Sequence, residues 1–286
     1  MSKSRENLPQ RLLEYTVVQD YSLYTEIDQA VWRHIMKISV PFFKKNAHNS
    51  YVNGLKMMNI PNNHIPRVDD MDKRLDNHDW GAVTVKGFIP PIVFMEFLSR
   101  KVLPIAVDMR TNEHITYTPA PDIIHEAAGH APIIADPDYA EYLCSYGEIA
   151  QKGIQSKHDS ELYKIIRKMS DMKENPNTDP TELKEIEDKF EKISQENHWV
   201  SEANELARMN WWTIEYGLVG SLDNPKIYGA GLLSSVSESS ECLKGKVKKI
   251  PITIDCIHQD YNITEPQPQL FVTKHFKDLT NILLEY

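Results

Sequence analysis

Apolar side chains recur at helical spacing between residues 28 and 43. Val31, Ile35 and Ile38 fall on one side of a helix with 3.6 residues per turn, so this segment predicts an amphipathic helix packed against a core. Proline lacks the backbone N–H that a helix interior needs, and we therefore expect this helix to end near Pro41.

Short apolar runs that follow predict strands around one helix. The runs at 83–85 and 104–107 have the composition of strands, and 115–118 predicts a strand that returns beside them. The apolar run at 92–98 begins directly after Pro91, a position that suits the first turn of a helix.

Residues 151–205 are densely charged and poor in aromatic side chains. Two apolar patterns at helical spacing predict an antiparallel helix pair, the first through Leu162, Ile165, Ile166, Met169 and Met172, the second through Leu183, Ile186, Phe190 and Ile193. Asp179 is expected to cap the second helix, with Pro180 at its first position and Glu182 three residues after the cap. We expect a charged helical-hairpin insertion that packs as a lid or an interaction arm.

Composition narrows the function classes. The 286 residues carry a net charge of -9, and the pI is near 5.7. Lysines and arginines are interspersed with acids, so no basic stripe for nucleic acid is present. The sequence contains no apolar run long enough to span a membrane, and the first 15 residues lack the apolar core of a secretory signal. Three widely spaced cysteines suit a reducing cytoplasm.

The strongest chemical pattern is a pair of histidines with a distant carboxylate. His125, His130 and Glu215 offer two imidazoles and one carboxylate to a single metal ion, a set that leaves coordination positions open for dioxygen. A regular helix aligns residues four apart, whereas these histidines are five apart. We therefore predict a single wider turn near Gly129, which would bring both rings back to one face.

Any two histidines are more often surface or core residues than metal ligands. Local context favours ligation here, because Pro119 and Pro121 stiffen the chain, Asp122 is placed to cap a helix, and an apolar body follows. The segment Gly229–Gly231 lacks a phosphate-loop pattern, and we interpret it as a close backbone approach beside the metal-binding helix.

Four sequence blocks in order carry a family resemblance. They are Pro119-Ala120-Pro121-Asp122-Ile123-Ile124-His125-Glu126-x-x-Gly129-His130, Thr213-Ile214-Glu215-Tyr216-Gly217-Leu218, Tyr228-Gly229-Ala230-Gly231-Leu232-Leu233-Ser234-Ser235 and Tyr261-Asn262-Ile263-Thr264-Glu265-Pro266-Gln267-Pro268. With them the chain resembles the aromatic amino acid hydroxylases from about Gly87 to Phe276. The resemblance implies a mostly α (α+β) fold, a helical basket with short strands around a non-haem iron site.

The resemblance also implies a reaction and a set of residues. Family members use Fe(II), dioxygen and tetrahydrobiopterin or a related tetrahydropterin to hydroxylate an aromatic ring through an iron(IV)-oxo species. By the same matching, iron would be held by His125, His130 and Glu215; the pterin by Phe94, Ile89 and Glu126, the last also catalytic; and the amino acid by Arg110, Thr118, Pro119, Trp211, Ser234 and Asp122.

Two positions bear on the substrate. Tryptophan-specific members tend to have Phe in place of Trp211, and tyrosine-specific members tend to have an acid in place of Ile263, so L-phenylalanine is the first choice, with conversion to L-tyrosine. Tyrosine and tryptophan remain alternatives. The chain departs from animal members at Pro104, where they often have His, and at Asn210, where they have Tyr.

Two rival functions stay open. A zinc hydrolase could use the same three ligands with Glu126 as general base, although the five-residue spacing argues against it. A non-catalytic binding module could use the fold alone, although all three ligands are present. We expect a single catalytic domain over 1–286, with 151–205 inserted, either complete or the catalytic part of a longer chain. We expect a cytoplasmic monomer or weak oligomer in aromatic amino acid metabolism and phenylalanine catabolism.

Overall fold

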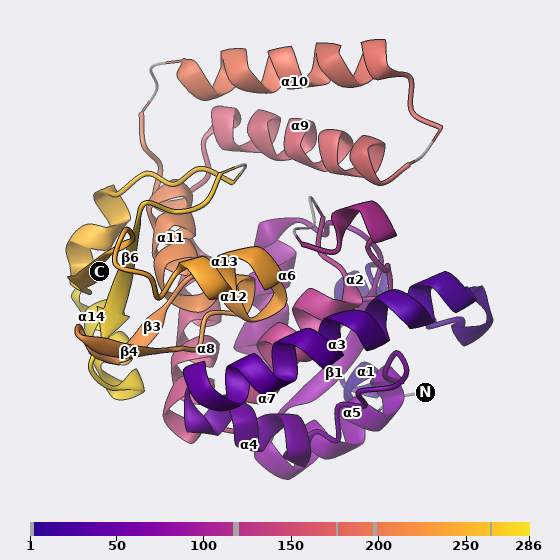
Figure 1. Ribbon diagram of the computed structural model, residues 1–286. Helices are drawn as coiled ribbons and strands as arrows, with labels where there is room; N and C mark the ends of the chain where they lie inside the picture. The colour runs from indigo at the N-terminus through magenta and orange to yellow at the C-terminus, as the bar shows by residue number, and fades with distance from the viewer. Residues whose placement is uncertain (1–2, 117–119, 176, 197–198, 264) are drawn as a thin grey trace.

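The computed structural model describes residues 3–116, 120–175, 177–196, 199–263 and 265–286 as helices packed around two small sheets (Figure 1). The α-helices are α1 (Lys3–Glu6), α2 (Gln10–Leu13), α3 (Glu26–Asn46), α4 (Asn49–Met57), α5 (Val68–Leu75), α6 (Pro91–Ser99), α7 (Ala131–Ile133), α8 (Pro137–Ala150), α9 (Lys157–Glu174), α10 (Pro180–Gln195), α11 (Glu202–Asn210), α12 (Ala230–Ser234), α13 (Val236–Glu241) and α14 (Phe276–Glu285). The strands are β1 (Gly81–Val85), β2 (Val102–Ala106), β3 (Leu218–Ser221), β4 (Asn224–Ile227), β5 (Lys248–Pro251) and β6 (Gln269–Thr273). Short 3₁₀ turns are η1 (Tyr21–Leu23), η2 (Asp76–His78), η3 (Asn112–His114) and η6 (Ile254–His258), and two π-helical segments are η4 (Ile124–His130) and η5 (Trp211–Glu215).

Helix α3 is longer than its sequence predicted. It begins at a capping box in which Thr25 and Asp28 bond reciprocally, and it continues through Pro41 to Asn46, so the predicted end near Pro41 was wrong. Pro41 is exposed, whereas Phe43 beyond it is buried against Tyr51. The apolar face thus continues past the proline, and its burial outweighs the lost backbone hydrogen bond.

The first sheet pairs β1 with β2 in parallel, and α6 forms the crossover between them. Both predicted strands and the predicted helix at 92–98 are therefore confirmed. The prediction of a returning strand at 115–118 was wrong for Ile115 and Thr116, the two of these residues that the structure describes. A 3₁₀ turn precedes Ile115 and Thr116. The hydroxyls of Ser235 and Ser237 donate to the carbonyl of Thr116, which therefore bonds side chains and not a neighbouring strand. Tyr117 and Thr118 lie outside the described residues.

The second sheet has the strand order β4-β3-β6-β5 and forms the C-terminal side of the molecule (Figure 1). Its inner residues join a large apolar core that includes Trp32 and Trp212, both fully buried. The segments η4 and η5 are covered by this core, and η4 packs against α12, α7 and β2. The core therefore surrounds the two irregular helices that carry the predicted metal ligands.

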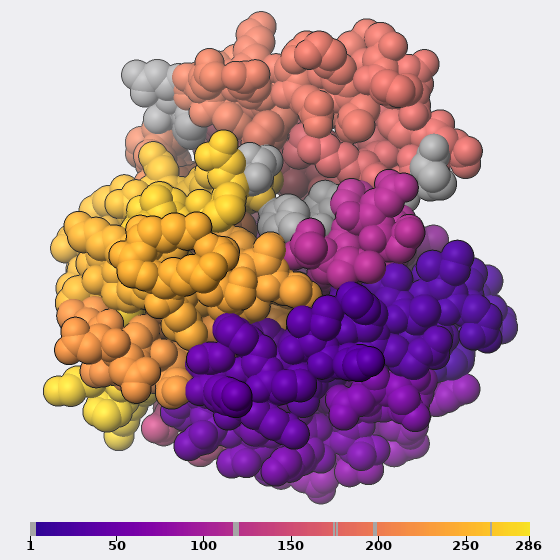
Figure 2. Space-filling model, viewed as in Figure 1, coloured from indigo at the N-terminus to yellow at the C-terminus, as the bar shows by residue number. Residues whose placement is uncertain are grey.

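The predicted helix pair is present as α9 and α10, with the Asp179 side chain capping α10 at the N–H of Thr181. Its apolar residues form a cluster of their own, which is separate from the main core: Leu162, Ile165, Met169, Met172, Leu183, Ile186, Phe190 and Ile193. We call α9 and α10 the hairpin. It lies as an extra layer over the rest of the molecule (Figures 1 and 2).

None of the helices in the described ranges combines the length and the apolar composition that crossing a membrane requires. All three cysteines are free thiols, and Cys242 and Cys256 are buried. Burial raises the pKa of each of these two thiols to about 12, so both behave as packing residues at neutral pH.

Candidate active site

The wide turn predicted near Gly129 is confirmed. Residues Ile124–His130 form a π-helix, and its wider winding places the rings of His125 and His130 together. Their Nε2 atoms lie 3.1 Å apart with the ring planes at 86°. Gly129 is required at this turn, because a Cβ there would lie 2.9 Å from the carbonyl oxygen of Ala230.

A second π-helix, which the sequence did not predict, delivers the carboxylate. It covers Trp211–Glu215, and Glu215 at its end faces both histidines. Glu215 Oε2 lies 3.3 Å from His125 Nε2, and Oε1 lies 3.3 Å from His130 Nε2. The three side chains offer ligand atoms that all lie within 4.8 Å of one another. The structure thus brings Glu215 together with two histidines that lie 85 and 90 positions earlier in the sequence.

The predicted close approach at Gly229–Gly231 is also confirmed. A Cβ on Gly229 would lie 2.4 Å from the carbonyl oxygen of Glu215, and one on Gly231 would lie 3.0 Å from the same atom. Because glycine has no Cβ, the start of α12 can pack directly on the backbone that carries Glu215. Side chains at either position would push the carboxylate out of place.

Charge and burial oppose each other at these three groups. Burial lowers the pKa of His125 to about 4, although Glu215 counteracts this. Burial would also lower the pKa of His130, but attraction to Glu215 outweighs it and raises that pKa. Burial would raise the pKa of Glu215, but the two histidines and a hydrogen bond from Asn210 lower it to about 2. Without a metal, one proton on this cluster takes the place of a cation.

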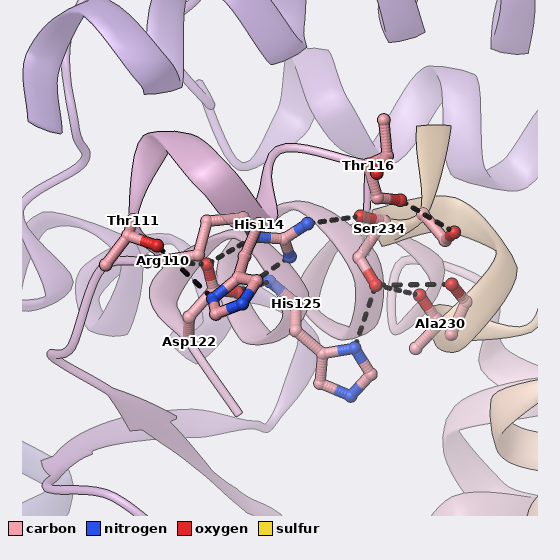
Figure 3. A network of polar contacts seen from close by, with 10 residues as sticks. Arg110, Thr111, His114, Thr116, Asp122, His125, Ala230 and Ser234 are labelled. Atoms are coloured by element: carbon pink, nitrogen blue, oxygen red, sulfur yellow. Dashed lines mark hydrogen bonds and ion pairs between the residues drawn. The ribbon is translucent and has the colours of Figure 1, made fainter. Parts of the chain in front are cut away.

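Ser234 determines which nitrogen of His125 is available. Its hydroxyl donates to the carbonyl of Ala230 at 2.8 Å and therefore accepts from Nδ1 of His125 at 2.9 Å (Figure 3). With the proton on Nδ1, the lone pair of Nε2 points toward His130 and Glu215. This is the tautomer that a metal bound at Nε2 requires.

Asp122 connects the site to a buried arginine. Its carboxylate accepts bonds of 2.7 and 2.9 Å from Nε and Nη2 of Arg110, and one of 2.9 Å from the backbone N–H of His125. Nη1 of Arg110 donates to the carbonyl of Ser234 at 3.0 Å (Figure 3). The Arg110 cation holds the pKa of the Asp122 carboxyl below its ordinary value, although burial would raise it. The pair is fully buried.

Glu126 is a buried carboxyl with an unsatisfied atom. Its Oε2 has no hydrogen-bond partner among the residues that the structure describes, and it lies 4.0 Å from His130 Nε2. Burial raises its pKa to about 8, although the neighbouring His130 opposes this shift. A buried polar atom of this kind is costly unless a ligand or water bonds to it.

The sequence pattern of the biopterin-dependent aromatic amino acid hydroxylases matches residues 3–166 and 188–286. The chain belongs to this family. It is 25% identical to a phenylalanine-4-hydroxylase of Pseudomonas aeruginosa, with 92% of this chain and 84% of that protein covered. It is 27% identical to one of Mesorhizobium japonicum, with coverages of 93% and 82%.

The fold agrees with the family. Phenylalanine hydroxylase of Chromobacterium violaceum, solved with bound iron(III) and oxidised 7,8-dihydrobiopterin, superposes with a TM-score of 0.74 at 23% identity. The superposition covers 99% of this chain and 90% of that one. This hydroxylase therefore has the expected mostly helical catalytic-domain fold.

The hydroxylase surrounds Trp211 with aromatic rings. Its indole stacks on Tyr216 at 4.5 Å and on Tyr261 at 4.3 Å between ring centroids, and its buried Nε1 has no hydrogen-bond partner in the described ranges. No role was predicted for Tyr261, although it belongs to one of the family motifs. Asn210 was noted only as a departure from the animal members, but in the structure its side chain hydrogen-bonds to Glu215.

The remaining predicted site residues lie in different surroundings. Phe94 is partly buried against the main core, and Ile89 is partly buried against a smaller cluster around Phe97 and Val83. Thr118 and Pro119 lie outside the described residues, so their predicted contact with substrate stays a prediction.

Proposed function

We propose that this hydroxylase converts L-phenylalanine to L-tyrosine with dioxygen and a tetrahydropterin, at an Fe(II) ion held by His125, His130 and Glu215. The observation that carries the proposal is the convergence of both Nε2 atoms and the Glu215 carboxylate, with 3.3 Å between ligand atoms. The names of the relatives, which are phenylalanine-4-hydroxylases, support the choice of substrate.

The donor set fits Fe(II). Two neutral imidazoles and one carboxylate bind a divalent ion and leave positions open for other ligands, whereas a structural zinc site would close its shell with a fourth side chain. Only these three residues form such a group in the described part of the chain. When bound, iron and the reduced pterin would together activate dioxygen for insertion into the ring.

One carboxyl beside the metal ligands suits a pterin. The buried Oε2 of Glu126 lacks a partner and would bond a polar group of the ring system, directly or through water. By the family resemblance, Phe94 would offer an aromatic face to the flat heterocycle, and Ile89 an apolar contact. In this assignment Glu126 orients the pterin beside the metal.

Arg110 would bind the substrate carboxylate. Three of its five N–H donors bond Asp122 and the carbonyl of Ser234, which fixes the guanidinium and leaves two donors for a ligand. Trp211, whose ring stacks on Tyr216 and Tyr261, would present the edge of its indole to the substrate ring, with Thr118 and Pro119 completing the pocket. Trp211 and Ile263 together favour phenylalanine over tryptophan and tyrosine.

The test is product analysis with each aromatic amino acid. Fe(II)-loaded protein, a tetrahydropterin and oxygen should form tyrosine from phenylalanine, and omission of iron or pterin should stop the reaction. Glu215→Gln should abolish turnover and weaken iron binding without unfolding the protein, while the exposed control Glu113→Gln keeps wild-type rates. Product formed only from tryptophan or only from tyrosine would identify that amino acid as the substrate instead. Normal turnover by Glu215→Gln would refute the assignment of the metal ligands.

We also propose that the enzyme works in the cytoplasm. Its three free cysteines, two of them buried, suit a reducing compartment. Fractionation of the source cells with an antibody to the protein tests this placement.

A further inference from the structure

Helix α9 of the hairpin has two different faces. Its apolar face packs against α10 through residues such as Ile165 and Met169. The neighbouring face carries Tyr163, Arg167 and Asp171, which are four residues apart and therefore lie on one side of the helix. Tyr163 donates to the carbonyl of Phe88 at 3.4 Å, so this polar face is the one turned toward the catalytic core.

A cavity of about 560 Å³ lies between this face and the core. From the hairpin, its wall includes Arg167, Ser170 and Asp171, and from the core it includes Arg110 and Asp122. The same cavity is therefore lined by residues assigned to the amino-acid end of the substrate. It is also lined by a helix that carries none of the predicted site residues. Figure 2 shows the hairpin lying above the rest of the molecule.

The charges of the cavity match a zwitterion. Three cations, Lys86, Arg110 and Arg167, face three carboxylates, Asp108, Asp122 and Asp171. Two of the carboxylates already have partners, because Asp108 accepts from the N–H of Gly87 at 2.7 Å and Asp122 binds Arg110. A polyanion such as a nucleotide would need an excess of cations. A ligand with one carboxylate and one ammonium group has no net charge, and it therefore fits a cavity with equal numbers of cations and carboxylates.

Arg167 is held at the edge of this cavity. Its guanidinium donates to the hydroxyl of Tyr163, one turn earlier on α9. One hydrogen bond leaves further N–H donors available for a carboxylate. Asp171, one turn later, is exposed and forms a wall of the same cavity.

We infer that α9 is the outer wall of the amino-acid site, with Arg167 binding the α-carboxylate of the substrate together with Arg110, and Asp171 binding its α-ammonium group. The inference rests on the proposed function, since it takes the ligand to be an aromatic amino acid. Arg167 and Asp171 lie in 167–187, the stretch between the two segments that match the family pattern. They are therefore positioning residues that this chain adds to the shared site.

The test separates the two charges with substrate analogues. Arg167→Ala should raise the KM for L-phenylalanine roughly fivefold, the scale of a partly exposed ion pair, with kcat and the KM for the pterin unchanged. It should weaken competitive inhibition by 3-phenylpropionate, which keeps the carboxylate, and leave inhibition by L-phenylalaninamide unchanged. Asp171→Asn should show the reverse pattern with the two inhibitors. Arg167→Lys should recover most of the loss.

Matched controls come from the same hairpin. Lys168→Ala and Asp188→Asn remove exposed charges that do not line the cavity, and both should keep the wild-type KM. Melting temperatures of all variants should agree with wild type. The inference is overturned if Arg167→Ala leaves the KM for phenylalanine within twofold of wild type, or if both inhibitors lose affinity equally.

Failure of the proposed function would look different. A wild-type protein that turns over none of the three aromatic amino acids would refute the hydroxylation itself. Calorimetric titration with L-phenylalanine then decides the inference separately, since binding that weakens in Arg167→Ala supports it and an absence of binding to the wild type overturns it.

Discussion

Ser234 Oγ lies 2.9 Å from Nδ1 of His125, and the hydroxyl proton is directed to the carbonyl of Ala230. The hydroxyl thus accepts from the imidazole and orients it. Metal-binding histidines commonly need such a partner on the other ring nitrogen, and its loss costs affinity.

Replacing Ser234 by Ala should therefore weaken iron binding about 10- to 100-fold, because the ring of His125 loses its fixed tautomer and orientation. Competition with a chelator gives the iron affinity. Ser240→Ala is the control, since this exposed hydroxyl bonds the carbonyl of Ser237 one turn earlier on the same helix. Equal iron affinities in wild type and Ser234→Ala would show that the hydroxyl does not orient the ligand.

Asp122→Asn should destabilise the fold by about 3 kcal/mol, because it leaves the Arg110 cation buried without its counter-charge. Urea unfolding measures the loss. The exposed pair of Lys73 and Asp70 supplies the contrast, and Asp70→Asn should change stability by less than about 0.5 kcal/mol. A loss at Asp122 no greater than at Asp70 contradicts the predicted cost.

Glu238 should make stability depend on pH. Its carboxylate accepts from the hydroxyl of Tyr216 at 2.8 Å, but burial dominates and raises its pKa above the ordinary 4.5. The folded state then holds the proton more tightly than the unfolded chain. This contribution is complete below pH 4.5 and is lost as pH rises through the raised pKa. The free energy of unfolding of wild type, relative to Glu238→Gln, should therefore fall as pH rises from 4.5.

Glu241, on the same helix, should behave in the opposite way. Hydrogen bonds from Lys244 and Lys246 lower its pKa to about 2. Its contribution to stability is present above the ordinary pKa of 4.5 and is lost as pH falls toward 2. The free energy of unfolding of wild type, relative to Glu241→Gln, should therefore rise as pH rises from 2 to 4.5. Added salt should reduce this difference because the group is exposed. If the stability difference between wild type and variant changed with pH in the same direction for Glu238→Gln and Glu241→Gln, the two opposite pKa shifts would be refuted.

The hairpin should unfold without the catalytic core. Ile186→Ala removes a side chain from the small apolar cluster, and it should destabilise α9 and α10 by about 2 kcal/mol. Hydrogen exchange should accelerate in the hairpin while η4 and η5 stay protected. Ile133→Ala, in the main core, should instead accelerate exchange throughout. Uniform acceleration in Ile186→Ala would mean that the two clusters unfold together.

The sequence allowed one π-helix to be predicted and not the other, for a physical reason. His125 and His130 lie on one segment, so their five-residue spacing demanded a wide turn if both bind one ion. Glu215 is the single ligand of its own segment, and no spacing within Trp211–Glu215 signals a change of winding. The glycines of α12 were informative because only a residue without a Cβ fits there.

Other features depended on packing that no local pattern encodes. The helix through Pro41 persists because apolar residues beyond it find a core, a gain that appears only after folding. Residues 115 and 116 alternate like a strand, yet serine hydroxyls from α13 and its cap bond the backbone instead. Arg167 and Asp171 look like ordinary solvated charges until the hairpin sets them at a cavity.

The winding of η4 also has an evolutionary consequence. Histidines five apart share a face on a π-helix, and histidines four apart share one on an α-helix. Loss of a single codon between them, at Ala127 for example, would leave the histidines four apart, so that an α-helical turn would keep the pair together. The residues after the second histidine would keep their place relative to the pair, because the wider turn alone holds the extra residue, so one codon can change the winding of this segment and leave the rest of the pocket where it is.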